Sequence, residues 1–372
     1  MSMSTEENQL ESSFKLDPLV PLLPNRVRRN YRGGYLLDQL DGNPAPGDGN
    51  KPEDWLASTV QAVNPGMSPL PDEGLSHVQT FSGKKCRLCD LFKMAPDYYL
   101  GSDHAGSGDP ELGFLAKLLD SSMRLHVQAH PTTAFAREHL HSPWGKLETY
   151  VILGLRDEKS SYIRLGFQRP PSPQEWRRIV LEQDIAAMDA CFDRIPIQLG
   201  EVWLVPGGLP HAIGEGVLML EVMEPSDLVV RCEFEREGIV IPPEARFMQT
   251  SVDLAMQIFD YTPLTAAQAK ATYCLTPQRL SPHEELLVGL AHTDRFSIRR
   301  FMTRDSMNLP PVGRARLGLV AGGRGTLTLG DREISLKEGF RFLLAASAPG
   351  GKATAHGGEV LEILFCSPGR KM

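Results

Sequence analysis

The sequence has little cysteine, no long apolar run and no excess of basic residues. Six cysteines in 372 residues are too few for a disulfide-stabilised scaffold, which favours a reducing, cytoplasmic compartment. No stretch of about 18 apolar residues occurs, so we expect no membrane-spanning helix. The 39 basic and 46 acidic residues give a net charge of −7, which argues against a broad nucleic-acid surface. An anionic small molecule would need a locally basic pocket.

The composition is that of a globular protein. Hydrophobic residues make up 41% and charged residues 23% of the chain, and its length corresponds to about two domains of roughly 150 residues each. The first residues are polar and acidic, without the basic and apolar regions of a signal peptide. We therefore expect a disordered leader over residues 1–24. No pattern in the sequence indicates an oligomeric state.

Short strands dominate the predicted secondary structure. The 34 glycines and 29 prolines favour many short strands joined by turns. Runs rich in Val, Ile and Leu predict strands at His126–His130, Leu147–Leu153, Ser161–Phe167, Val202–Pro206, Val217–Val222 and Leu228–Phe234. Apolar spacing and capping residues predict helices at Leu112–Asp120, Ser172–Cys191 and Ser251–Tyr261. From about Glu284 onward the pattern predicts strands only, which is typical of a barrel or sandwich.

One predicted strand places three possible metal ligands on a single face. His126, Gln128 and His130 alternate with Val127 and Ala129, so they point the same way on a strand. Three such groups are costly inside a barrel unless they bind something. The alternative is a polar edge that faces solvent. The alternation alone leaves open whether His126 or Gln128 joins His130 as a ligand.

A glycine- and proline-rich turn supplies a further histidine. Gly200, Pro206, Gly208 and His211 fit the cupin signature G-x5-P-x-G-x2-H, and such a tight turn aims the histidine into the mouth of a barrel. We therefore expect a mostly β fold with helical insertions, built from two cupin-type β-barrel or jelly-roll units. The first unit, at residues 25–280, carries the metal site. The second, at residues 281–372, lacks a histidine at ligand spacing, so we expect no metal there.

Charged residues near these motifs complete the candidate site. Lys146 and Glu148 share one face before an apolar run, where the alternative is a surface ion pair. Asp227 and Arg231 are four residues apart and share a face of the following strand, where the alternative is a structural ion pair. Imidazole and carboxylate ligands suit Zn²⁺ or another divalent first-row ion. The lone Cys86-x-x-Cys89 pair has no second pair at zinc-finger spacing, so we do not expect zinc there.

These motifs, taken in order, resemble the class I mannose-6-phosphate isomerases, which are zinc-dependent cupins. The resemblance covers roughly residues 25–368. It rests on the segments Gly33–Asp38, Glu53–Ser58, Gln128–Pro131, Gly145–Glu148, Pro206–Gly216 and Ser226–Arg231.

The resemblance implies a ligand set and a reaction. The implied ligands of one Zn²⁺ per chain are Gln128, His130, Glu148 and His211, which selects Gln128 over His126. Lys146, Asp227 and Arg231 fall on substrate and catalytic positions. The implied activity is the reversible isomerisation of mannose 6-phosphate and fructose 6-phosphate through a cis-enediol, with a sugar phosphate as the small-molecule partner.

Two alternatives remain at the level of sequence. A non-enzymatic cupin descended from an isomerase would bind a sugar phosphate without turnover. A cupin oxygenase would hold Fe(II) with His130, Glu148 and His211 as a two-histidine, one-carboxylate triad.

Overall fold

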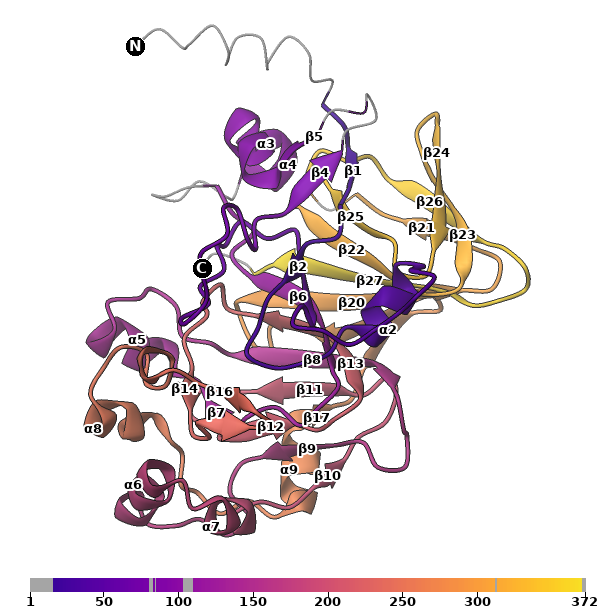
Figure 1. Cartoon of the computed structure of the whole chain (residues 1–372). Coiled ribbons are helices and arrows are strands. Elements are labelled where there is room, and N and C mark those ends of the chain that lie inside the picture. The colour runs from indigo at the N-terminus through magenta and orange to yellow at the C-terminus, as the bar shows by residue number, and fades with distance from the viewer. Residues whose placement is uncertain (1–15, 80–82, 84, 103–109, 312, 370–372) are drawn as a thin grey trace, which may run out of the picture.

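Four β-sheets stacked in consecutive layers form most of the molecule, and short helices lie at its outer sides (Figure 1). The computed structural model describes residues 16–79, 83, 85–102, 110–311 and 313–369. The described chain is mostly β-structure with short helices, as the sequence predicts.

The first two layers enclose the candidate site. The first is a five-stranded antiparallel sheet of β10 (Ile195–Pro196), β9 (Tyr162–Leu165), β12 (His211–Ile213), β7 (Gln128–Ala129) and β14 (Val230–Arg231), in that order. The second has seven strands in the order β17 (Cys274–Leu275), β11 (Val202–Val205), β8 (Glu148–Leu155), β13 (Val217–Met223), β6 (Leu115–Ser121), β3 (Glu53–Leu56) and β2 (Arg26–Val27). Buried side chains of both sheets, such as Tyr150 and Ile213, form one apolar cluster between them.

The last two layers come mainly from the C-terminal part of the chain. The third sheet contains β1 (Leu19–Pro21), β25 (Arg341–Leu344), β22 (Arg316–Gly322), β27 (Leu361–Pro368), β20 (Phe296–Thr303), β19 (Glu284–Val288) and β18 (Gln278–Ser281). The fourth contains β21 (Ser306–Leu309), β26 (Gly351–Ala355), β23 (Arg324–Leu329) and β24 (Arg332–Lys337). The second and third sheets pack back to back: Val151 and Leu220 share one core with Leu319 and Leu364. The expected run of strands after Glu284 is confirmed for the described residues.

Helices cover the outer face of the five-stranded sheet. Val127 and Ala129 of this sheet pack against Trp176 and Ile179. Ser172 begins helix α6 as predicted, because its hydroxyl accepts a hydrogen bond from the Glu175 N–H at 3.1 Å. The helices are α2 (Tyr35–Leu40), α3 (Leu88–Met94), α4 (Pro96–Leu100), α5 (Thr133–His139), α6 (Pro173–Glu182), α7 (Ile185–Ala190), η2 (Pro243–Ala245), α8 (Val252–Ala255), η3 (Met256–Ile258) and α9 (Ala266–Tyr273). Two small hairpins, β4 (His77–Gln79) with β5 (Lys85–Arg87) and β15 (Glu235–Arg236) with β16 (Ile239–Val240), complete the fold.

Two sequence expectations need correction. The helix expected at Leu112–Asp120 is wrong, because Leu115–Ser121 forms strand β6 with all seven residues buried. Both faces of this sheet are covered, so apolar residues occupy both faces of the strand and do not alternate strictly with polar ones. Their spacing from Leu112 to Leu119 is also compatible with a helix. The leader expected at residues 1–24 extends too far: Leu19–Pro21 pairs with β25 of the third sheet. Residues 1–15 lie outside the described part of the chain.

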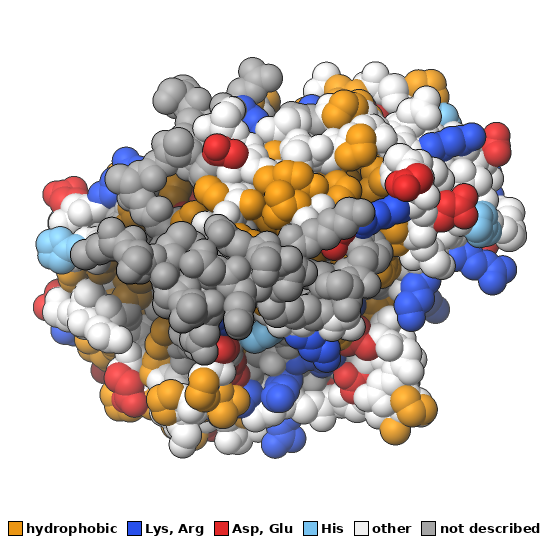
Figure 2. Space-filling view, turned by 90° about the horizontal axis from the view of Figure 1, so that it is seen from above, with side chains coloured by type: hydrophobic (Ala, Val, Ile, Leu, Met, Phe, Trp, Pro, Cys, Tyr) orange, Lys and Arg blue, Asp and Glu red, His pale blue; other side chains and the backbone are white. Residues whose placement is uncertain are grey.

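The surface carries both signs of charge. On the face shown in Figure 2, the described hydrophobic side chains form one larger group and several smaller ones, with acidic and basic side chains interspersed among them. None of the helices in the described ranges has the length and apolarity needed to cross a membrane.

Candidate metal centre and pocket

His130, Glu148 and His211 converge from two facing sheets. His130 directly follows β7 and His211 begins β12 of the five-stranded sheet, whereas Glu148 begins β8 of the seven-stranded sheet. The Nε2 atom of His130 lies 3.1 Å from Oε1 of Glu148, and the Nε2 atom of His211 lies 3.6 Å from Oε2. All three side chains are 1–2% exposed. Among the described residues this is the one group of three His, Cys, Asp or Glu side chains placed to hold a metal ion.

Backbone carbonyls fix the orientation of both imidazoles. The Nδ1 atom of His130 lies 2.8 Å from the carbonyl oxygen of Leu228, and that of His211 lies 2.9 Å from the carbonyl oxygen of Leu209. A carbonyl only accepts, so Nδ1 carries the proton and donates in each ring. Each Nε2 therefore presents a lone pair to the centre of the cluster. This arrangement is typical of histidine ligands whose second nitrogen is held by the protein.

The cluster fits a divalent cation. No described side chain or backbone group gives a hydrogen bond to Nε2 of His130 or to Oε1 of Glu148. Burial lowers the pKa of His130 to about 4, against the opposing charge of Glu148, so the ring is neutral at pH 7. Burial alone would raise the pKa of the Glu148 carboxyl, but His130 and Lys146 hold it well below its usual range. Neutral imidazoles and an ionised carboxylate facing one another suit Zn²⁺.

Gln128 lies beside this cluster. It pairs with His211 of β12 on one side and with Arg231 of β14 on the other, so the three side chains form one row across the sheet. Its Nε2 atom lies 3.3 Å from Nε2 of His211. Rotation of the Gln128 amide by 180° places its Oε1 where its Nε2 lies, facing His211. His126, two residues along the strand, lines the adjoining pocket. The alternative of a solvent-facing polar edge is wrong, because His126 and His130 are 5% and 1% exposed.

Lys146 connects the metal cluster to Asp227. Its Nζ atom lies 3.2 Å from Oε1 of Glu148 and 3.9 Å from Oδ1 of Asp227. The lysine is 4% exposed. The alternative of a surface Lys146–Glu148 pair is therefore wrong.

Asp227 pairs with a residue that the motif analysis did not single out. Arg29 donates to both of its carboxylate oxygens, at 3.0 and 3.2 Å. Burial opposes ionisation of Asp227, but Arg29 and Lys146 hold the pKa of this carboxyl below its usual range. Arg231 donates instead to the backbone carbonyl of Ala245 at 2.7 Å. The alternative of a structural Asp227–Arg231 pair is not formed, although both residues line the same pocket.

A buried charged network was missed by motif reasoning. Lys117 of β6 lies 3.0 Å from Glu221 of β13 and 3.6 Å from Glu53 of β3, and Glu53 accepts from Arg29 at 2.8 Å. Register places Glu221 opposite both Lys117 and Tyr150. The available signal was the single charge of Glu221 within the otherwise apolar strand β13, because such a charge is costly unless it is paired.

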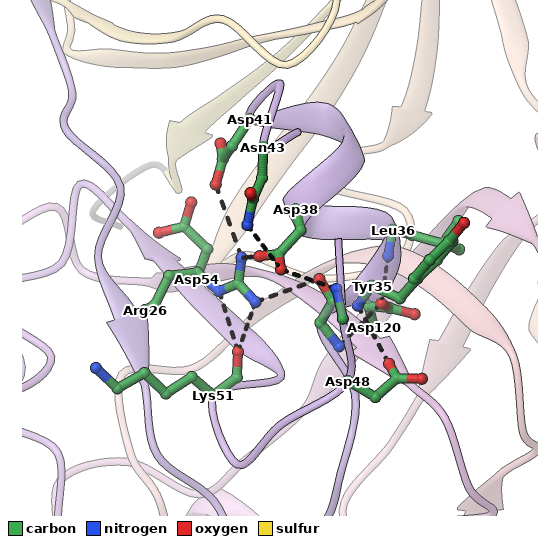
Figure 3. A network of polar contacts seen from close by, with 12 residues as sticks. Arg26, Tyr35, Leu36, Asp38, Asp41, Asn43, Asp48, Lys51, Asp54 and Asp120 are labelled. Carbon is green, nitrogen blue, oxygen red and sulfur yellow. Dashed lines mark hydrogen bonds and ion pairs between the residues drawn. The ribbon is translucent and has the colours of Figure 1, made fainter. Parts of the chain in front are cut away.

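The N-terminal segment that carries Arg29 is tied to the sheet at both ends. Arg26 donates to Asp38 of α2 at 3.0 Å and to the carbonyl oxygen of Lys51 (Figure 3). The Asp120 carboxylate accepts from the N–H groups of Gly34 and Leu36 at the start of α2. A carboxylate at a helix N-terminus is favourable. This network holds residues 29–31 against the pocket.

The pocket combines these groups in about 570 Å³ of open space. Four basic side chains line it: Arg29, Lys117, Lys146 and Arg231. Of these, Arg231 has no carboxylate partner within ion-pair distance among the described residues, whereas Arg29, Lys117 and Lys146 each have two. Burial and the nearby Glu148 carboxylate raise the pKa of Glu221, which favours its neutral form. Positive charge therefore predominates in the pocket.

Sequence comparison finds relatives but no matching family model. Over 231 residues the chain is 27% identical to a mannose-6-phosphate isomerase of Streptococcus mutans, an alignment that covers 62% of this chain and 67% of that protein. It is 25% identical over 236 residues to the mannose-6-phosphate isomerase ManA of Bacillus subtilis, with coverage of 62% and 68%.

Solved structures share the fold. A mannose 6-phosphate isomerase from Bacillus subtilis superposes with a TM-score of 0.69 at 20% identity, covering 94% of this chain and 99% of that one. A mannose 6-phosphate isomerase bound with zinc and yttrium superposes with a TM-score of 0.71 at 16% identity, covering 95% and 100%. The sequence relatives and these structures confirm the resemblance to class I mannose-6-phosphate isomerases.

Proposed function

We propose that the chain is a zinc-dependent mannose-6-phosphate isomerase that interconverts mannose 6-phosphate and fructose 6-phosphate through a cis-enediol. The observation that carries the proposal is the buried His130–Glu148–His211 cluster. It lies in direct contact with Gln128 and Lys146, which line a pocket rich in Lys and Arg. The names of the sequence relatives support the substrate class. We propose two cupin units at residues 25–280 and 281–372, the first of which holds the metal. The strands of the third sheet mostly belong to the second unit, but β1 (Leu19–Pro21) and the first residues of β18 (Gln278–Ser281) lie outside it.

His130, Glu148 and His211 hold the metal, and Gln128 completes the set through its amide oxygen. The neutral imidazoles and the ionised carboxylate supply the ligands that zinc prefers. When bound, the zinc ion supplies electrophilic stabilisation of negative charge on sugar oxygens. The neighbouring Tyr150 donates to Oε2 of Glu148 at 2.5 Å, which orients this carboxylate.

Asp227 is the proton acceptor in this proposal. An aldose–ketose isomerisation removes the proton at carbon 2 and returns one to carbon 1, while a hydroxyl proton moves from oxygen 2 to oxygen 1. The acceptor must be ionised and fixed in the pocket. Asp227 meets both conditions, because Arg29 holds both of its oxygens and lowers its pKa.

Lys146 and Arg231 stabilise the charge that develops on the sugar oxygens. Lys146 stands between Glu148 and Asp227, within reach of both the metal ligands and the proton acceptor. Arg231 lies in the same row of side chains as Gln128 and keeps its guanidinium free of carboxylates in the described chain. A fixed cation beside a developing enediolate lowers the barrier without reorganisation.

The predominance of positive charge suits a sugar phosphate, which is a dianion. The basic side chains that line the pocket also favour a sugar phosphate substrate over oxygenase chemistry at His130, Glu148 and His211. None of the six cysteines, all of which lie within the described residues, forms a disulfide, which agrees with the proposed cytoplasmic location.

The proposal is tested by fructose 6-phosphate formation from mannose 6-phosphate on the purified chain, before chelation, after chelation and after Zn²⁺ is restored. We expect turnover that disappears on chelation and returns with zinc. Sugar-phosphate binding without turnover in the zinc-loaded protein would instead support the non-enzymatic alternative. Oxygen uptake with bound iron would support the oxygenase.

A further inference from the structure

His126 lines the pocket but has an unpaired ring nitrogen. The residue is 5% exposed, and none of the described residues gives its Nε2 atom a hydrogen bond. In the proposed mechanism this side chain neither binds the metal nor transfers a proton. A buried polar nitrogen without a partner is unfavourable, so a group that enters the pocket and pairs with it gains affinity.

The backbone fixes where this ring lies. The Leu125 N–H donates to the carbonyl oxygen of Ile213 at 2.9 Å, and the Cys232 N–H donates to that of Val127 at 2.8 Å. The segment is therefore held between β12 and β14. Because Val127 is anchored in the apolar cluster under the helices, His126 must face the pocket.

His126 lies away from the metal cluster along the strand. Each two-residue step of an extended chain advances about 6.6 Å, so the backbone of His126 is about 6.6 Å from that of Gln128 and about 13 Å from that of His130. A hexose 6-phosphate carries its reacting carbonyl and its phosphate at opposite ends of a six-carbon chain. With the carbonyl end at the metal ligands, the phosphate points toward the far end of the pocket.

The surroundings of His126 are positively charged. Arg124 makes two bonds to Glu233, at 2.6 and 2.8 Å, and Arg236 donates to the Arg124 carbonyl oxygen at 3.0 Å. Of the guanidinium groups near this ring, Arg231 of β14 lines the pocket itself, and no carboxylate of the described residues lies within ion-pair distance of it. It leaves an excess of positive charge on this part of the pocket. Such an excess attracts a dianion.

We propose that His126 donates a hydrogen bond to the phosphoryl group of the substrate at the end of the pocket away from the metal ligands. This inference rests on the proposed sugar-phosphate isomerase function. It makes His126 a residue that selects phosphorylated over unphosphorylated hexoses.

The test compares His126→Ala with the zinc-loaded wild-type chain. We expect KM for mannose 6-phosphate to rise about tenfold or more, the scale of one lost hydrogen bond to a charged group, with kcat and bound zinc unchanged. Competitive inhibition by inorganic phosphate should weaken by a similar factor. His126→Gln, which keeps an N–H donor, should recover part of the affinity. His283→Ala is the matched control, because this exposed histidine lies far from the pocket in the third sheet.

The outcomes separate this inference from the proposed function. If the wild type turns over but His126→Ala leaves KM and phosphate inhibition unchanged, the inference is overturned and the function stands. Loss of zinc in His126→Ala would likewise overturn it, because His126 would then support the metal site. If the wild type does not isomerise mannose 6-phosphate, the inference is tested by calorimetry of inorganic phosphate binding to the wild type and to His126→Ala. Weaker binding to the variant supports the inference, and equal binding overturns it.

Discussion

At the scale of single residues, the site depends on which atoms are left without partners. The Nε2 atom of His130 receives no hydrogen bond from the described residues, and the neighbour of Glu148 Oε1 on its other side is the Lys146 ammonium at 3.2 Å. Arg231 is free of carboxylates in the described chain, whereas Arg29 is neutralised by Glu53 and Asp227. The proposed roles follow these differences: metal binding for His130 and Glu148, charge stabilisation for Arg231 and positioning for Arg29.

His211→Ala should lose the metal while the chain stays folded. The histidine is buried, its Nδ1 donates to the Leu209 carbonyl, and its Nε2 faces Gln128 and Glu148 of the metal cluster. Alanine removes this ligand and leaves the surrounding backbone hydrogen bonds in place. We expect zinc content and turnover to fall together, with an unchanged far-ultraviolet circular dichroism spectrum. Full activity in a zinc-free variant would remove His211 from the metal site.

Arg231→Ala should keep the metal and lower kcat by about 100-fold, the scale of losing one charged contact to a transition state. The guanidinium lies one strand away from Gln128 and touches no metal ligand by hydrogen bond or ion pair. The measurement is kcat together with zinc content. An unchanged kcat would exclude Arg231 from catalysis.

At the scale of elements, the edge of the five-stranded sheet is held by one buried ion pair. Arg124 and Glu233 are 3% and 1% exposed at their side chains, and Glu233 also accepts from the Val127 N–H at 2.7 Å. The pair connects the strand that carries the metal ligands to the segment after β14. Apolar packing under the helices fixes the other face of the same strand.

Glu233→Gln should destabilise the fold by about 3 kcal/mol at pH 7, because it leaves the buried Arg124 charge without its main partner. Burial opposes ionisation of Glu233, but Arg124 holds its pKa below 4.5. The contribution of ionised Glu233 to the free energy of unfolding is therefore present above pH 4.5. This contribution is lost as the pH falls through the lower pKa that Glu233 has in the folded state. Thermal unfolding across this pH range should show a flatter profile for the variant than for the wild type.

The control for this experiment is Glu175→Gln, which breaks an exposed pair with Arg178 on α6. We expect no measurable change in its melting temperature, because exposed ion pairs contribute little. Equal effects of the two substitutions would show that the buried pair has no special role.

At the scale of the whole molecule, the two inner sheets share one hydrophobic core. Side chains from the second and third sheets belong to a single cluster, and β1 from the start of the chain pairs with β25 near its end. Arg341 adds a polar connection, since it lies 2.6 Å from both Asp41 and Asp54. Exposing either inner face would uncover a large apolar surface.

The two halves should therefore unfold in one transition. All four tryptophans, Trp55, Trp144, Trp176 and Trp203, lie in the first 203 residues, so their fluorescence reports only the N-terminal part. Far-ultraviolet circular dichroism reports the strands of both parts. We expect the two probes to give the same denaturation midpoint. Separate midpoints would show that the halves fold independently.

The sequence by itself determined the local chemistry. Alternation along residues 126–130 placed the ligand-type side chains on one face, the turn before His211 was readable from its glycines and prolines, and Ser172 marked the start of α6. Each of these depends on neighbours within a few residues, and the structure confirms each arrangement.

Only the tertiary structure decided how distant segments combine. The sequence of β6 predicted a helix because a strand covered on both faces loses strict alternation, and its leucines then fall at helical spacing. The partner of Asp227 is Arg29, 198 residues away, and no local pattern predicts a pairing over that distance. The same holds for β1 in the third sheet, since its register depends on a strand more than 300 residues later. Long-range contacts are set by how the sheets pack, and packing is a property of the whole chain.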